Sequence, residues 1–444
     1  MAEKTWAEMT PEERRAFRID KWRNPEVEFK SPEAEAAYKA RVERLVAAIN
    51  LQEPDRVPVA LTAGFWPAAW AGLTPYEAMH DAERAAQAWV DFNLEFQLDV
   101  MISPLMQTVP AAVFEKLDYR LYSWPGHGVA KEASYQYNER EWMLPEEYDH
   151  LISDPTDYMV RVYLPRTVGA FAGFANLTSF FDFMELPFVS SHVGAWASPE
   201  MKTSVERLTQ AGDLVAAWAQ TTFAKIGELL TLGFPPYWGG ATKAPFDILG
   251  DTLRGTRNMV LDLYRRPEKV LAACERLTSV ALDFVRYRPG GAATPVIFIP
   301  LHKGADGFMS DEQFRTFYWP SLRALLLGLI EDGYIPFLFA EGGYNSRLEV
   351  IKDLPKAGTI WLFDQTDMAR AKETIGQVAC IQGNVPLSLM CTGTPEEVTE
   401  YARKLIETVG RGGGFILDVG AVVDEGKSEN LHAMIKAAHE YGHY

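Results

Sequence analysis

Polar side chains follow each of five short apolar runs in the second half of the chain, and these side chains are the first candidates for chemistry. In a parallel barrel, groups just beyond the strand ends face the active site. Several of them stand beside glycines, which let a ligand approach the backbone. The pattern therefore predicts one shared site at one end of the sheet. Its members are His302, Glu341, Tyr344, Asp364, Gln382, Asn384 and Asp418.

Two of these residues, His302 and Glu341, carry the catalytic hypotheses. Three roles are open to His302: a metal ligand, a general acid or base, and a structural histidine held by hydrogen bonds. Glu341 follows apolar Phe339 and precedes two glycines, a setting that raises a carboxyl pKa and favours a proton donor. Metal binding through its oxygens is the alternative.

The apolar runs alternate with helical stretches, and this alternation predicts a parallel sheet. The runs are apolar at nearly every position, as in strands covered by helices on both faces. A doubly wound open sheet would give the same pattern, but neither GxGxxG after a strand nor GxxxxGK(S/T) occurs. We expect a (β/α)8 TIM barrel, with strands at 296–299, 335–339, 359–363, 378–381 and 415–417.

The N-terminal part of the sequence predicts an extension and the first strands of the barrel. Thr10-Pro11 and Ser31-Pro32 have the form of helix starts, with a capping hydroxyl followed by proline. Long helices are expected further on. We assign residues 1–50 to a helical extension, 51–444 to the barrel, 56–61 and 99–102 to its first strands, and 200–232 and 246–288 to helices.

An aromatic stretch interrupts the barrel pattern at residues 114–145. Tyr119 and Tyr122 precede a Pro-Gly pair, and Tyr135 and Tyr137 follow it. Such a pattern predicts an inserted β-hairpin in a barrel loop. Two interpretations are open, a structural flap and a wall that touches the substrate.

Composition limits the class of protein and its partners. The net charge of −17 argues against a nucleic-acid partner and against an anionic membrane surface. Three scattered cysteines are too few for a disulfide framework, and no apolar run is long enough to span a bilayer. The first residues show no apolar signal region. We therefore expect a cytoplasmic protein, with a homodimer as one candidate assembly.

Four motifs in the C-terminal part carry a family resemblance. They are Gly-Asn-Val-Pro at 383–386, Gly-Thr-Pro-Glu-Glu-Val at 393–398, Gly-Gly-Gly-Phe-Ile-Leu at 412–417, and Glu-Asn-Leu at 429–431 followed by Ala-Met. In this order and spacing they resemble the uroporphyrinogen decarboxylase superfamily, whose first strand is similar to Asp-Arg-Val-Pro-Val at 55–59. The resemblance implies a (β/α)8 barrel with its site at the C-terminal face.

The sequence departs from two branches of that superfamily. The decarboxylase carries Arg-Gln-Ala-Gly-Arg after its first strand, whereas residues 62–70 here are aromatic and uncharged, and would not hold a polycarboxylate. Thiol-directed methyltransferases carry His-x-Cys and a later Cys as zinc ligands. Phe339, Glu341 and Ala421 stand at the matching positions, so the thiolate zinc site is absent.

The remaining resemblance is to methyltransferases that demethylate a small substrate, such as an aromatic methyl ether, and deliver the methyl group to a Co(I) corrinoid. No Asp-x-His-x-x-Gly motif occurs, so a separate corrinoid protein is the expected partner. The leaving phenolate needs a proton or a Lewis acid. Glu341 or His302 would donate the proton, with Asp364 tuning it; alternatively His302, Glu341 and another oxygen ligand would hold zinc.

Substrate contacts are assigned on the same basis. Phe65, Trp66, Tyr237 and Trp238 are candidates for an apolar wall around an aromatic ring, with ordinary core packing as the alternative. The polar candidates are Tyr344, Gln382, Asn384 and Asp418. The alternative function is a decarboxylase or lyase of the same superfamily that acts on another substrate.

Overall fold

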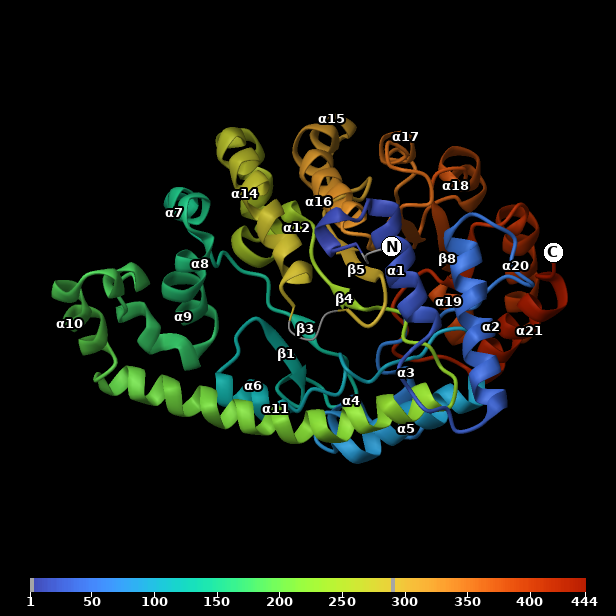
Figure 1. Cartoon of the computed structure of the whole chain (residues 1–444), viewed down its shortest axis with the longest axis horizontal. Coiled ribbons are helices and arrows are strands. Elements are labelled where there is room, and N and C mark those ends of the chain that lie inside the picture. The colour runs from blue at the N-terminus through green and yellow to red at the C-terminus, as the bar shows by residue number, and fades with distance from the viewer. Residues whose placement is uncertain (1–3, 289–291) are drawn as a thin grey trace.

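A parallel sheet of six strands forms the centre of the computed structural model, which describes residues 4–288 and 292–444 (Figure 1). The strand order follows the chain, from β4 to β9. The parallel α/β class predicted from the sequence is therefore confirmed. The strands are β4 (Gly240–Ala241), β5 (Val296–Leu301), β6 (Ile335–Ala340), β7 (Ile360–Phe363), β8 (Cys380–Val385) and β9 (Phe415–Val419).

Two strand ends differ from the prediction in a way that matters for the site. β8 continues to Val385 and β9 to Val419, whereas the apolar runs end at 381 and 417. Gln382, Asn384 and Asp418 are thus strand residues and not loop residues. All three are buried, because both faces of these strands are covered.

Helices follow the strands and cover the sheet, and Figure 1 shows several of them in an arc around it. Local sequence explains where they begin. The Thr394 hydroxyl accepts a hydrogen bond from the Glu397 N–H, and the Thr394 N–H donates one to the Glu397 carboxylate. The connecting helices are α15 (Asp311–Gln313), η7 (Phe314–Tyr318), α16 (Trp319–Glu331), α17 (Leu348–Ile351), α18 (Met368–Ile375), α19 (Leu387–Thr392), α20 (Pro395–Leu405), η8 (Ile406–Gly410) and α21 (Ser428–Tyr441).

The predicted strands at 56–61 and 99–102 are present only as bridged segments. Val59 bridges Leu417 of β9 in parallel, and Met101 bridges Pro236, which precedes β4. The Asp99 N–H donates to the Val59 carbonyl at 3.0 Å. A regular ladder does not form at Val59, because Pro58 has no N–H and the Val59 N–H donates to the Asp99 carboxylate at 2.7 Å.

A buried ion cluster holds these bridged segments. The Asp99 carboxylate pairs with Arg44 at 2.6 Å and with Arg56 at 2.8 Å, and all three side chains are almost fully buried. Arg44 also pairs with the more exposed Asp55 at 2.6 Å. The cluster joins helix α2 (Pro32–Ile49), which carries Arg44, to the segment that follows it. Loss of one member would leave a buried charge without its partner.

The first two long helices begin as the sequence predicts. In α1 (Pro11–Arg23) the Thr10 hydroxyl accepts from the Glu13 N–H, and in α2 (Pro32–Ile49) the Ser31 hydroxyl accepts from the Ala34 N–H. The short η1 (Trp6–Glu8) precedes them. α2 buries an apolar face that includes Val42, Leu45 and Ile49.

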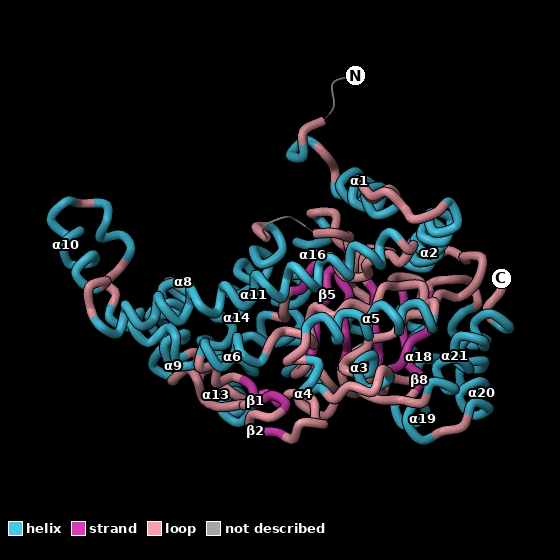
Figure 2. The backbone as a smooth tube through the Cα atoms, turned by 90° about the horizontal axis from the view of Figure 1, so that it is seen from below, coloured by secondary structure: helices cyan, strands magenta, loops and turns pink. Residues whose placement is uncertain are grey.

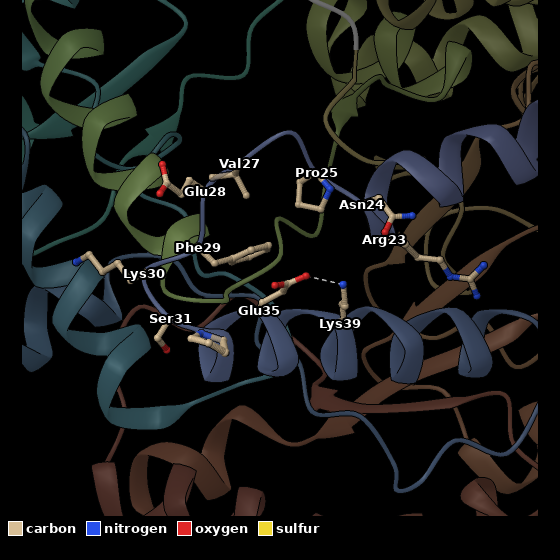
Figure 3. A pocket seen from close by; sticks show the side chains of 11 residues that line it. Arg23, Asn24, Pro25, Val27, Glu28, Phe29, Lys30, Ser31, Glu35 and Lys39 are labelled. Carbon is tan, nitrogen blue, oxygen red and sulfur yellow. Dashed lines mark hydrogen bonds and ion pairs between the residues drawn. The ribbon is translucent and has the colours of Figure 1, made fainter.

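The link between α1 and α2 borders a surface pocket of about 520 Å³ (Figure 3). Its lining alternates in charge, and Glu35 pairs with Lys39 across one turn of α2 at 2.6 Å. The pocket lies on the N-terminal helices and shares no residue with the strand ends, so it is not part of the candidate site.

The predicted inserted hairpin is a small three-stranded sheet. β1 (Tyr122–Pro125) pairs with β3 (Gln136–Tyr137) in antiparallel fashion and with β2 (Gly128–Val129) in parallel. The ring of Tyr122 packs against those of Tyr135 and Tyr137. The helices before this sheet are α3 (Trp66–Trp70), α4 (Pro75–Ala78), α5 (Ala82–Phe96) and α6 (Ala111–Leu117).

A long helix, α11 (Pro199–Thr231), matches the helix predicted at 200–232. The short helix η4 packs against it, and other short helices of residues 145–195 pack around η4 and on one another. Figures 1 and 2 show α10 at the end of α11 that lies away from the sheet. The short helices are η2 (Pro145–Glu147), α7 (Tyr148–Ser153), α8 (Pro155–Tyr158), η3 (Met159–Tyr163), α9 (Leu164–Thr167), η4 (Gly169–Asn176), η5 (Phe180–Met184) and α10 (Leu186–Ala195).

The stretch 246–288 is helical but broken into shorter pieces. Gly255, with a φ of 73°, ends the first pieces, and Pro267 starts the last one. Within residues 4–288 and 292–444, no helix combines the length and the apolar character needed to span a bilayer. The pieces are α12 (Pro245–Asp247), η6 (Ile248–Arg254), α13 (Thr256–Arg265) and α14 (Pro267–Arg286).

Candidate active site

His302 is the first residue after β5, and a carboxylate from the preceding helices holds its ring. The Nδ1 atom lies 2.5 Å from Oδ2 of Asp251, which belongs to η6. The sequence pattern does not predict Asp251 as a site residue. Two lysines also reach this carboxylate, Lys243 at 2.9 Å and Lys303 at 3.2 Å. The loop after β5 and the helices after β4 thus share one charged centre.

A second carboxylate fixes the backbone of the same loop. Asp247 accepts hydrogen bonds from the N–H groups of His302 and Lys303, each at 3.0 Å, and from the Tyr318 hydroxyl at 2.8 Å. Burial and the nearby Asp251 carboxylate together raise the pKa of Asp247 to about 6, although the charge of His302 opposes them. Asp247 positions the loop and does not face solvent.

The charge of His302 is set by this arrangement. Burial alone would lower the pKa of His302, but the hydrogen bond to Asp251 and the charges of Asp247 and Asp251 outweigh it and raise the pKa above the usual value. Burial alone would likewise raise the pKa of Asp251, but His302, Lys243 and Lys303 hold it well below the usual range. The Asp251 carboxylate therefore favours the protonated form of His302.

Glu341 is the first residue after β6, and it faces the free nitrogen of His302. Its Oε1 lies 3.7 Å from the His302 Nε2. Burial raises the pKa of Glu341, and the carboxylates of Asp247, Asp251 and Asp364 raise it further, although His302 opposes them. The two side chains retain exposures of 34% and 44%, so this pair is open to solvent. We call Asp247, Asp251, His302, Lys303 and Glu341 the His302 cluster.

Asp364, the first residue after β7, supports the Glu341 loop from the other side. Its carboxylate accepts from the Gly342 N–H at 3.0 Å, and burial raises its pKa. Asn384 of β8 donates to the carbonyls of Asp364 and Thr366, at 2.9 and 3.0 Å. Its buried Oδ1 finds no partner among the described residues. Asp364 and Asn384 line a pocket of about 700 Å³ beside α18 and α20.

Gln382 and Asp418 belong to a separate group in the interior of the sheet. The Tyr237 hydroxyl donates to the Gln382 Oε1 at 2.6 Å, and the Gln382 Nε2 donates to Asp418 at 2.8 Å. Thr62 donates to the same carboxylate through its hydroxyl at 3.1 Å. Burial raises the pKa of Asp418 to about 7. We call Tyr237, Gln382, Asp418 and Thr62 the Asp418 chain.

The hydrogen bonds of the Asp418 chain also indicate that the sheet is curved. Tyr237 lies just before β4, at one edge of the strand order, whereas Gln382 and Asp418 lie in β8 and β9 at the other edge. A direct hydrogen bond between them requires the sheet to curl so that its two edges approach each other.

The four residues of the predicted aromatic wall do not lie together in the structure. Phe65 packs against Tyr135 of the inserted sheet. Trp66 packs against Phe92 and Phe96 in the core. No hydrogen bond or ring contact within the described residues joins Trp66 to His302 or Glu341.

Trp238 and Tyr344 are also core residues. Trp238 packs against Phe298 and Phe337, and its buried Nε1 has no partner among the described residues. Tyr344 is fully buried below the loop that carries His302, and a Cβ at Gly304 would lie only 2.5 Å from its hydroxyl. A glycine is therefore required two positions after His302. Substrate contact by these aromatic residues stays a prediction.

The inserted sheet lies next to the His302 cluster. The Tyr137 hydroxyl donates to the Asp251 carbonyl at 2.9 Å. Burial and the nearby Asp251 carboxylate raise the pKa of Tyr122. Of the two interpretations of the aromatic insertion, this position favours a wall of the site.

The arrangement does not fit the expected zinc ion. Across residues 4–288 and 292–444, no group of three or more His, Cys, Asp and Glu side chains is placed to hold a metal. The Nδ1 of His302 is engaged by Asp251, and only Glu341 faces its Nε2. Burial raises the pKa of the Cys380 thiol to about 12, which disfavours the thiolate that a metal would need.

A parallel α/β fold with a charged cluster at its strand ends defines an enzyme-type architecture. The profile of the family described as uroporphyrinogen decarboxylase (URO-D) matches residues 219–441, which is half of the chain. The chain belongs to this family. The matched residues include β4 to β9 and every member of the His302 cluster.

The relatives are distant. The chain is 29% identical to uroporphyrinogen decarboxylase of Methylococcus capsulatus over 208 residues, which cover 45% of this chain and 57% of that protein. It is 24% identical to the enzyme of Pseudoalteromonas translucida over 224 residues, covering 48% and 60%. The chain thus spans little more than half the length of these curated relatives.

A solved structure similar to this one is a methyltransferase from Methanosarcina mazei. It superposes with a TM-score of 0.53 at 15% sequence identity and covers 90% of this chain and 98% of its own. At this identity the likeness supports a shared fold and nothing finer.

Proposed function

We propose that the chain is a methyltransferase that removes a methyl group from a small methylated substrate, such as an aromatic methyl ether. The observation that carries the proposal is the solvent-open pair of His302 and Glu341 at two neighbouring strand ends, 3.7 Å apart. A leaving phenolate needs a proton, and each member of this pair has a raised pKa. His302 or Glu341 donates that proton, and Asp251 keeps the His302 ring charged.

A reduced corrinoid on a separate protein would accept the methyl group, as the sequence resemblance implies. The site fits an external acceptor in one respect, because the two acidic groups are reachable from solvent and not sealed in the core. The inserted aromatic sheet beside Asp251 offers a surface for an aromatic ring. No step in this proposal requires zinc.

The charges of the site weigh against a polycarboxylate substrate. Lys243, Lys303 and the protonated His302 are the cations described around Asp251, and all three already pair with its carboxylate. Residues 62–70 add no positive charge. A decarboxylase of another substrate is the second candidate, favoured by the family profile and by the curated relatives.

The sheet and the bridged segments are the basis of a proposal for the whole fold. The bridges at Val59 and Met101 and the hydrogen bond from Tyr237 to Gln382 support a closed eight-membered barrel, in which segments 56–61 and 99–102 stand in for two strands. In the same proposal, residues 1–50 are an extension of a barrel that spans 51–444.

An anaerobic assay tests the function. The purified chain is mixed with a reduced corrinoid protein and a panel of methoxyarenes, and the spectral change from Co(I) to methyl-Co(III) is followed together with phenol release. Both signals are expected with at least one methoxyarene. No change with methoxyarenes, methylamines or methylthiols, while a control methyltransferase loads the same corrinoid protein, would reject the proposal in favour of a decarboxylase.

A further inference from the structure

An apolar surface far from the His302 cluster has no partner within the described chain. Residues 169–198, which we call the apolar arm, comprise η4, η5 and α10 and lie at the end of α11 away from the sheet (Figures 1 and 2). Six large side chains of the arm are between 51% and 88% exposed. They are Phe180, Phe181, Phe183, Met184, Leu186 and Phe188.

The size of this surface matches one half of a stable interface. At about 200 Å² for a large apolar side chain, the six residues expose on the order of 800 Å², which is the area that each partner buries in a standard protein interface. The largest apolar patch on a typical monomer is about 300–600 Å². The summed apolar area of these six side chains is larger than such a patch.

The arm is a built structure and not a loose loop. Gly173 of η4 sits directly on α11, where a Cβ would lie 2.6 Å from the Met201 Cα, and its N–H donates to the Ser204 hydroxyl at 3.0 Å. The His192 ring is buried and packs between Phe180 and Phe183. The remaining aromatic surface is held facing outward by this packing.

The charged residues of the apolar arm limit which kind of partner could cover it. Between Arg166 and Lys202 there is no lysine or arginine, and only Asp182 and Glu185 are charged before Glu200. A surface that binds anionic lipid carries basic residues beside its apolar side chains, so this arm does not suit such a membrane. Interfaces that form and separate are about as polar as the rest of a protein surface, whereas permanent homodimer interfaces are more apolar.

We propose that the apolar arm is the interface of a homodimer in which η5 and α10 of one copy pack against the same elements of a second copy. A two-fold contact requires a surface that complements itself, and an apolar patch with few charges meets that requirement. The chain carries a net charge of −17, so two copies would repel each other through most other faces. This inference is independent of the proposed function.

The oligomeric state of the full chain tests the proposal. Sedimentation velocity and light scattering over a range of concentrations are expected to show a dimer for the natural sequence. Phe181→Glu combined with Leu186→Glu is expected to raise the dimer dissociation constant by about a hundredfold, because each copy would bury unpaired charges. Phe223→Glu, at an α11 side chain that is 56% exposed outside the arm, is the matched control and is expected to remain dimeric.

Three results would overturn the proposal. The first is a natural chain that is monomeric at every concentration. The second is a dimer that survives the double substitution. The third is flotation of the natural chain with phosphatidylcholine or phosphatidylglycerol vesicles, which would assign the arm to a lipid surface. Circular dichroism of each variant checks folding, and Leu186→Cys with a short bis-maleimide provides a variant without added charge, expected to yield a covalent dimer through the arm.

Discussion

The His302 cluster and the Asp418 chain both lie along the parallel sheet, yet they differ in charge and in access to solvent. His302 and Glu341 are the first residues after their strands, and they remain partly exposed with raised pKa values. Gln382 and Asp418 lie inside their strands, where each polar group is bonded to another buried group. A polar residue just past its strand end can therefore exchange a proton with a ligand, whereas one a few residues earlier, inside the strand, bonds within the core.

Asp251 and Asp418 are both buried aspartates, but their surroundings differ in charge. His302, Lys243 and Lys303 hold the pKa of Asp251 below its usual range, and the Asp251 carboxylate in turn raises the pKa of His302. Asp418 has no cation within its hydrogen-bond network, and burial raises its pKa to about 7. We therefore expect Asp251 to govern activity and Asp418 to govern stability.

Removal of the Asp251 carboxylate should have the largest effect on turnover. Asp251→Ala leaves His302 without its ion partner and should lower methyl transfer by about a hundredfold, a usual contribution of a positioned acid or base. Asp251→Asn removes the negative charge but keeps the contact that orients His302, because the amide oxygen can still accept a hydrogen bond. Without the negative charge the pKa of His302 falls, so activity should be lost at a lower pH than in the natural chain. Unchanged pH–rate profiles in both variants would remove Asp251 from the site.

Loss of Asp418 should act on stability instead. Asp418→Ala leaves the Gln382 amide and the Thr62 hydroxyl without their acceptor, which costs about 2–3 kcal/mol of unfolding free energy. Urea denaturation measures the change, and the rate constant per folded molecule should stay within about twofold, well below the effect of a lost acid or base. A variant that folds normally but has lost turnover would instead place the Asp418 chain in the active site.

The two exposed members of the site should show smaller, matched effects. His302→Ala and Glu341→Gln are each expected to lower turnover by at least about tenfold with the fold intact, because each removes one candidate proton donor. His432→Ala and Glu95→Gln are the controls, since these two residues form a surface pair at 3.0 Å on α21 and α5. Natural activity in both site variants would end the proposed role of this pair.

Part of the candidate site could be predicted from the sequence, because the residues that follow parallel strands lie at the same end of the sheet. His302, Glu341 and Asp364 were identified in that way. Gln382 and Asp418 were assigned to the same site because the apolar runs end early, at 381 and 417, while the strands continue. A polar residue inside a fully covered strand cannot be told from one just past its end by composition alone.

Asp247 and Asp251 could not be found by the same reasoning. They follow β4, which is only two residues long and has no β-rich run to mark it. A signal was present, since Lys243, Asp247 and Asp251 recur at intervals of four residues. That spacing places them on one helical face, but it does not show that the face turns toward His302.

The smallest expected effect is on the pH dependence of stability, and it tests the difference between Asp418 and Asp251. A carboxyl whose pKa is raised in the folded state binds protons more tightly there than in the unfolded chain, so its contribution to stability falls as pH rises. For Asp418 this loss runs from its unfolded pKa of about 4 to its folded value of about 7. Asp251, whose pKa is lowered, contributes in the opposite sense and at lower pH. Urea midpoints of the natural chain and Asp418→Asn, measured from pH 4.5 to 8, should therefore shift in favour of the variant as pH rises. A constant difference across this range would mean that Asp418 stays ionised, and the contrast between the two aspartates would disappear.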